Sequence, residues 1–223
     1  MRTAIVLFAR SPEREAAEKR MRFAAPLFRA LVASWLDAAQ RQGAVPVVAC
    51  AAGDREALAS IAPEIEREWI EQRGATFGER AARASEEAFA RGFDAIVLAA
   101  IDAPPRELGE IFASLERGVP AISPSRDGGI NCIGLLAPEA ELLARFTQRR
   151  RDLVQVCRQY FERVAIVGGT IDVDDGSALA IARRDRAWRA FLPQAKLQQP
   201  SNPATQQPGH AVHSASRGPP ASV

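Results

Sequence analysis

A continuous apolar run that ends on an acid constrains the fold of this chain more than any other feature. Residues 95–101 read Ala-Ile-Val-Leu-Ala-Ala-Ile, and Asp102 and then Ala-Pro-Pro follow directly. An unbroken apolar run of this length is typical of a strand that is covered on both faces, as in parallel sheets. Ligands of open α/β sheets bind beyond the carboxyl ends of such strands. Asp102 is therefore a candidate site residue, and the alternative is that it caps a following helix.

Strand-like apolar runs alternate with helical patterns along most of the chain. Strands are expected over residues 3–9, 45–50, 68–72, 95–101, 120–123, 130–136 and 164–167. Helices are expected near residues 25–42, from residue 54, and over 77–91, 105–117, 138–145, 151–163 and 177–192. This order is typical of βαβ units, which build a mostly parallel sheet covered by helices. We predict one α/β domain over residues 1–193.

The remaining residues, 194–223, have a different composition. They are rich in Gln, Pro, Ser, Gly and Ala and contain almost no large apolar side chain. Such a segment cannot offset its loss of conformational entropy by burial. We therefore predict that residues 194–223 form a disordered tail.

Composition narrows the classes of function. The net charge of +2 is too small to indicate binding to nucleic acid or membranes by electrostatic attraction. No apolar run approaches the ~18 residues of a transmembrane helix. Three scattered cysteines in apolar surroundings indicate reduced thiols and a cytoplasmic location. Both histidines, His210 and His213, lie in the tail, so the predicted domain has no imidazole base or ligand. Carboxylates, arginines, backbone amides and a divalent ion remain for chemistry.

Two further acidic segments accompany Asp102. Asp172 and Asp174 alternate on an expected strand, so they would face one side and could bind a hard cation together. The alternative is that Asp174 or Asp175 caps the last helix. In Asp127-Gly128-Gly129, the glycines allow close ligand approach and Asp127 could accept hydrogen bonds from a sugar. An ordinary Asp-Gly hairpin turn is the alternative there.

Basic residues gather between the first expected strand and the first long helix. They are Arg10, Arg14, Lys19, Arg20 and Arg22. No glycine-rich phosphate motif follows the strand, but a phosphate-bearing ligand of an open α/β sheet would lie at this loop. The alternative is a solvated helical turn with i,i+4 charge pairs.

The order of the segments FAR-SP, GATFGER, IDAPP, SRDGGINCIGL and IDVDD resembles the bacterial selenodomain-associated transferases of glycosyltransferase-A (GT-A) fold. The resemblance covers residues 3–185. It implies a GT-A-like three-layer α/β/α sandwich with a mostly parallel central sheet. It also implies that Asp102 and Asp174 hold Mg²⁺ or Mn²⁺ against a diphosphate, and that Asp127 and Gly128 line the sugar or acceptor side.

The chain departs from this family pattern in its first loop. Where the family carries a Pro-Gly turn and then Lys-Thr-Arg, this chain has Arg14-Glu15 and Glu18-Lys19-Arg20, so Glu18 stands in the place of a cation. A serine after Asp102 is replaced by Ala103, and an aromatic pair by Ile130-Asn131. A carboxylate at a phosphate position weakens binding unless Lys19 or Arg10 compensates.

The combined interpretation is a metal-dependent glycosyltransferase or nucleotidyltransferase. It would act on a nucleotide-sugar or nucleoside triphosphate with a small-molecule acceptor that the sequence does not identify. The alternative is a family member that binds a nucleotide, sugar or partner protein without turnover. Asp102 and Asp127 are the predicted catalytic residues, and Asp102 and Asp174 the predicted metal ligands. The predicted substrate contacts are Arg10, Lys19, Arg20, Gly128 and Gly129.

Overall fold

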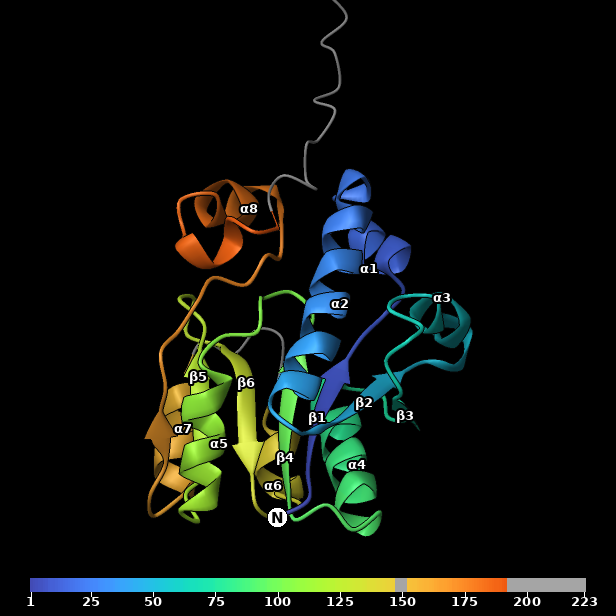
Figure 1. Cartoon of the computed structure of the whole chain (residues 1–223). Coiled ribbons are helices and arrows are strands. Elements are labelled where there is room, and N and C mark those ends of the chain that lie inside the picture. The colour runs from blue at the N-terminus through green and yellow to red at the C-terminus, as the bar shows by residue number, and fades with distance from the viewer. Residues whose placement is uncertain (147–151, 192–223) are drawn as a thin grey trace, which may run out of the picture.

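The computed structural model describes residues 1–146 and 152–191. Seven strands in the described residues form one sheet (Figure 1). They are β1 (Thr3–Phe8), β2 (Val45–Cys50), β3 (Glu68–Glu71), β4 (Ala95–Ala100), β5 (Ala121–Pro124), β6 (Ile130–Leu135) and β7 (Ala165–Ile166). Eight α-helices accompany them: α1 (Pro12–Glu18), α2 (Ala25–Arg41), α3 (Arg55–Ala59), α4 (Phe77–Ala90), α5 (Leu108–Glu116), α6 (Ala140–Ala144), α7 (Leu153–Tyr160) and α8 (Gly176–Ala182).

The sheet has the order β3-β2-β1-β4-β6-β5-β7 and is mostly parallel. Strand β6 is the exception, because it pairs antiparallel with both β4 and β5. The chain builds outward from β1 through β2 to β3 and then returns to place β4 on the other side of β1. A reversal of this kind opens a crevice at the carboxyl ends of the two strands at the switch point. In this chain that crevice lies beyond β1 and β4.

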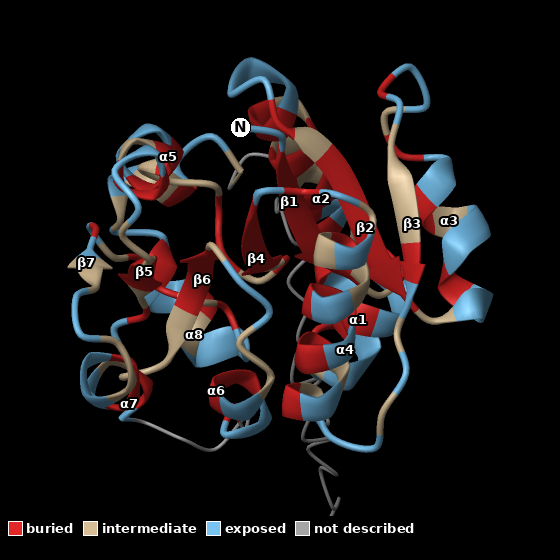
Figure 2. Cartoon of the chain, turned by 90° about the horizontal axis from the view of Figure 1, so that it is seen from below, coloured by how far each residue is buried: buried red, intermediate tan, exposed pale blue. Residues whose placement is uncertain are grey.

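The two faces of the sheet are covered by different helices, which makes a three-layer sandwich (Figure 2). Alternate strand residues supply the two cores, as the period of a strand requires. Ile5 and Leu7 pack with side chains of α2 and α5, whereas Ala4 and Val6 pack with side chains of α4, α6 and α7. Burial on both faces explains why the central strands are continuous apolar runs.

A third apolar cluster lies beyond the carboxyl ends of the strands. It joins α1 and the first half of α2 to α8, which sit together above the sheet in Figure 1. Phe28 and Leu31 of α2 meet Leu179 of α8 and the fully buried Trp188. This cluster also includes Val173, so it holds the acidic segment against the end of the sheet.

Three expected elements differ from the structure. Helix α5 begins at Leu108 rather than residue 105, because Glu107 directly before it has a left-handed backbone with φ +53°, which helical residues do not adopt. Residues 171–175 form a loop rather than a strand, and the backbone N–H of Val173 donates to the carbonyl of Asp102. The last helix ends at Ala182, and a separate 3₁₀ turn follows over Arg186–Trp188.

Three further predictions concern the cysteines, membrane-spanning helices and the C-terminal tail. Cys50, Cys132 and Cys157 are free and buried, as expected. None of the described helices is both long and apolar enough to cross a membrane. The predicted tail over 194–223, which holds both histidines, lies outside the described residues.

Candidate active site

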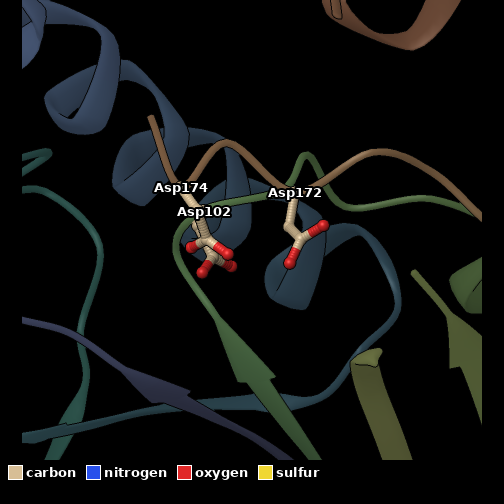
Figure 3. Close-up of side chains that lie close together, drawn as sticks. All are labelled: Asp102, Asp172 and Asp174. Carbon is tan, nitrogen blue, oxygen red and sulfur yellow. The ribbon is translucent and has the colours of Figure 1, made fainter. Parts of the chain in front are cut away.

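Three carboxylates lie close together at the crevice beyond the carboxyl ends of β1 and β4. Asp102 follows β4, and Asp172 and Asp174 come from the loop before α8 (Figure 3). One oxygen from each side chain lies within 4.8 Å of the others. Val173 is fully buried in the third apolar cluster, and its flanking aspartates both turn to the cavity. The expected alternation therefore holds, although the segment is a loop.

Helix capping does not explain Asp102 or Asp174. The N-cap of α5 is Glu107, which makes no side-chain capping hydrogen bond. Helix α8 is capped by Asp175, whose Oδ1 accepts from the backbone N–H groups of Ser177 and Ala178, both at 2.8 Å. Capping was thus the correct alternative for Asp175, while Asp102 and Asp174 remain available to a ligand.

Lys19 supplies a cation to this cluster. Its Nζ donates to Asp102 Oδ2 at 3.1 Å and to Asp174 Oδ1 at 2.8 Å, and also to the Val173 carbonyl at 2.8 Å. Burial by itself would lower the pKa of the Lys19 ammonium, but the negative charges of Asp102, Asp174 and Glu15 raise it on balance. Lys19 therefore stays charged throughout the ordinary pH range.

Asp172 sits in a different environment from the other two acids. Burial raises its pKa, the nearby charges of Asp102 and Asp174 raise it further, and a hydrogen bond from the Ser125 hydroxyl acts in the opposite direction. Asp102 and Asp174 are the two members that Lys19 contacts. The cluster thus carries more negative charge than the ammonium neutralises.

The donor set fits a hard divalent cation. Mg²⁺ and Mn²⁺ prefer oxygen ligands, and with metal–oxygen bonds of ~2.0–2.6 Å one ion can bridge oxygens up to about 5 Å apart. The three carboxylate oxygens meet that limit. The ligand pair expected from the sequence, Asp102 and Asp174, is accompanied by Asp172, which shares its segment with Asp174.

A cavity of about 490 Å³ opens beside the carboxylates at the ends of β1 and β4. Arg10 and Lys19 from the first loop and Arg80 from α4 give its wall positive charge, and Glu15 and Glu18 add negative charge. Phe8 and Phe77 form an apolar part of the wall. Their rings pack edge to face, with the ring centroids 5.6 Å apart. The cavity wall therefore combines charged and apolar surface.

The Asp127-Gly128-Gly129 segment is both a hairpin turn and part of this wall. It connects the antiparallel strands β5 and β6, and Asp127 Oδ1 accepts from the Gly129 N–H at 2.8 Å. Gly128 has φ +92°, a conformation that a side chain strongly disfavours. Asp127 and Gly129 line the cavity, and Gly128 shapes the turn that places them.

The basic residues of the first loop separate in the structure. Arg10 lines the cavity and pairs with Glu15, Nη1 to Oε2, at 3.1 Å. Arg20 is exposed, has φ +56° and is not among the residues that line the cavity. Glu18 does line it, at the place where the family resemblance expects a cation.

Sequence reasoning missed several residues of the cavity wall, among them the polar residues Gln72 and Arg80. Gln72 follows β3 and donates to the Ala49 carbonyl at 2.6 Å, and Arg80 donates to the Gly74 and Ala75 carbonyls. An arginine on an amphipathic helix ordinarily reads as a solvated residue. The presence of Arg80 in the GATFGER segment was the one signal that pointed to it.

Solved structures that share this architecture include two whose names are those of a transferase and a synthase. The structure of a "putative nucleotide-diphospho-sugar transferase" from Desulfovibrio desulfuricans G20 superposes with a TM-score of 0.71 and 23% identity, covering 87% of this chain and 95% of that one. A 4-diphosphocytidyl-2C-methyl-D-erythritol synthase from Anaerococcus prevotii superposes with a TM-score of 0.55 and 10% identity, covering 81% and 96%. No curated protein matches the chain. The expected GT-A-like α/β/α sandwich is confirmed, and the class is that of nucleotidyl- and sugar-transferase-like folds.

Residues 35–150 match the DUF2064 family, described as an uncharacterized protein conserved in bacteria, and the chain belongs to this family. The narrower likeness to selenodomain-associated transferases stays a prediction.

Proposed function

We propose that this protein is a metal-dependent transferase that acts on a nucleotide-sugar or a nucleoside triphosphate. One observation carries the proposal: the three-aspartate cluster and the basic residues Arg10, Lys19 and Arg80 share a single cavity at the switch point of the sheet. Ligands of open α/β sheets bind at such a point. The transferase-like fold of the solved relatives adds support.

The charged part of the cavity wall suits a polyphosphate. Asp102, Asp172 and Asp174 would hold Mg²⁺ or Mn²⁺, which when bound offsets charge on phosphate oxygens. Arg10 and Arg80 contribute guanidinium groups that hydrogen-bond phosphate oxygens and orient the chain of phosphates. No protein nucleophile is required, because transfer between bound partners proceeds by positioning and charge stabilisation.

The apolar part of the cavity wall and Asp127 suit the uncharged parts of the ligands. Phe8 and Phe77 present apolar surface against which a base or sugar ring packs. Asp127 is positioned by the Gly128 turn and carries a carboxylate that accepts a hydrogen bond from a sugar or acceptor hydroxyl. We assign Asp127 and Gly129 to the acceptor side and leave Arg20 out of the binding set.

A thermal-shift panel tests this proposal. Nucleoside triphosphates and nucleotide-sugars are added with and without Mn²⁺, since a bound ligand raises the melting temperature by mass action. We expect a rise that requires both nucleotide and metal, and Arg10→Ala should reduce it. Arg20→Ala is the matched control and should behave as the parent. A panel in which no nucleotide raises the melting temperature contradicts the proposal.

Binding without turnover is the second candidate function, and Glu18 favours it. This carboxylate lines the cavity beside Arg10 and Lys19, where it repels phosphate. Assays for nucleotide hydrolysis or transfer separate the two functions: metal-dependent binding with release of a phosphate product supports the transferase. If the parent binds nucleotide without any product, the binding role is the correct one. Glu18→Lys should strengthen binding in either case.

A further inference from the structure

We propose that Lys19 is a tethered competitor of the metal, whose ammonium group occupies the aspartate cluster until a divalent cation displaces it into the cavity. This inference rests on the proposed function, because it concerns how the same site is loaded. It goes beyond that function by assigning to one side chain of this chain the control of metal entry.

The contacts of Lys19 resemble those of a bound cation. Its Nζ lies 3.1 Å from Asp102 Oδ2 and 2.8 Å from Asp174 Oδ1, and so bridges the two segments that form the cluster. The Val173 carbonyl accepts a third hydrogen bond at 2.8 Å. An ammonium has three N–H donors, so these contacts use its full capacity. The Lys19 side chain is only 10% exposed.

The first loop is built to deliver this ammonium. Lys19 is the C-cap residue of α1, and Glu15 lies one turn earlier, with its Oε1 3.6 Å from Nζ. Glu15 is buried and also pairs with Arg10. Glu15 therefore fixes two of the basic residues of the cavity wall, Arg10 and Lys19. The consequence is a lysine held at the cluster by its own helix.

A divalent ion and the ammonium cannot both use the cluster as it stands. An ion bound to one oxygen of each aspartate lies within ~2.0–2.6 Å of those oxygens, beside a cation that contacts two of the same carboxylates. Like charges this close repel strongly where water is scarce. The carboxylates must release Lys19 to gain the metal. Lys19 already lines the cavity, so the displaced ammonium stays within the site.

Mn²⁺ binding to the full chain, measured by electron paramagnetic resonance, tests the competition. We expect Lys19→Met, which removes the charge and keeps most of the side-chain length, to bind Mn²⁺ at least about tenfold more tightly than the parent. Arg20→Met is the matched control. It removes the same charge from the neighbouring residue of the first loop, which is exposed and does not line the cavity. The Mn²⁺ affinity of this variant should stay within about twofold of the parent.

A second measurement needs no variant, and it tests the competition between Lys19 and the metal even if Lys19→Met does not fold. The chain contains two lysines, Lys19 and Lys196, so acetylation by an N-hydroxysuccinimide ester is read directly by peptide mass spectrometry. Displacement from three acceptors frees the amine for reaction. We expect saturating Mn²⁺ to increase labelling of Lys19 relative to Lys196 in the parent chain.

The outcomes separate this inference from the function on which it rests. If the parent and Lys19→Met bind Mn²⁺ with equal affinity and Lys19 labelling does not change, the tethered competitor is wrong and the metal site stands. If neither protein binds Mn²⁺, the metal-dependent function is wrong, and the competition is wrong with it.

Discussion

Asp102 lies at the end of a strand whose other residues are almost fully buried, yet its own side chain is 22% exposed. Its carboxylate contacts Lys19 rather than a helix terminus. A side chain placed in this way contributes little to the core, because its partners are the ammonium group of Lys19 and solvent. The position is thus free to serve a ligand.

Substitution of Asp102 by Asn is expected to separate folding from metal binding. The amide keeps the shape of the side chain but removes one of three negative charges from the cluster, so Mn²⁺ affinity should fall by about tenfold or more. The melting temperature should change little, because no helix cap is lost. Isothermal titration with Mn²⁺ and a thermal melt provide the two measurements. A protein that no longer folds would show that Asp102 is structural.

At the level of single residues, the sequence indicated some site positions and not others. The place of Asp102 beyond the end of a buried strand could be predicted from the apolar run, although the run left helix capping open as an alternative. The role of Lys19 was not predictable, since its partners Asp102 and Asp174 are 83 and 155 residues away in the chain. Arg20 was predicted as a substrate contact from its place in the same loop, but it is exposed and is not among the residues that line the cavity.

Two tryptophans tie the two acidic segments to the helices around them. Trp188 Nε1 donates to the Ile171 carbonyl at 3.0 Å, at the start of the loop that carries Asp172 and Asp174. Trp35 of α2 donates to the Ala103 carbonyl at 2.8 Å, directly after Asp102. Both indoles are buried, so each carbonyl depends on its tryptophan for a hydrogen-bond partner.

Trp188→Phe is expected to loosen the loop of Asp172 and Asp174. The change keeps an aromatic ring but leaves a buried carbonyl without a donor, which costs about 1–3 kcal/mol in the free energy of unfolding. Mn²⁺ affinity should fall as well, since the ligands are less well fixed. Urea unfolding and Mn²⁺ titration measure the two effects.

Trp69→Phe provides the control for this substitution. Trp69 lies on β3 and packs against Arg55, away from both acidic segments. Its replacement should leave Mn²⁺ affinity unchanged. If Trp188→Phe also binds Mn²⁺ as the parent does, the indole hydrogen bond does not organise the cluster.

At the level of elements, strands were predicted more accurately than helix ends. The residues of β1, β2 and β4 are nearly all buried on both faces, so their apolar runs define their limits. The helix expected over 177–192 breaks because Asp185 Oδ1 accepts from the Ala187 N–H and begins a separate turn. Such local side-chain hydrogen bonds compete with a helix and are not visible in a hydrophobic pattern.

Because of its three buried cysteines, we expect the protein's free energy of unfolding to depend on pH in the alkaline range. Burial raises the pKa of Cys50 to about 11, with the charge of Asp54 adding to the effect, and raises the pKa of Cys132 and Cys157 to about 12. In the unfolded chain a thiol ionises near pH ~8.5. The stability linked to these thiols is therefore fully present below that pH and is lost as pH rises through the folded values.

We expect the native protein at pH 8 to resist a thiol-alkylating reagent at all three cysteines. The unfolded chain in urea should react at all three. The free energy of unfolding should decline between pH 9 and 11, and Cys132→Ala should lessen that decline. Rapid labelling of the native protein at pH 8 would show that a thiol is open to solvent, contrary to its burial.

The limits of the folded unit are a prediction about the whole chain. Within the described residues, the third apolar cluster ends with Trp188 and Phe191. The residues after Pro193 contain almost no large apolar side chains with which to extend it. A chain truncated after Pro193 should therefore melt at the same temperature as the full chain and bind Mn²⁺ with the same affinity. A melting temperature several degrees lower would mean that residues 194–223 pack on the domain, and His210 and His213 would then become candidates for the site.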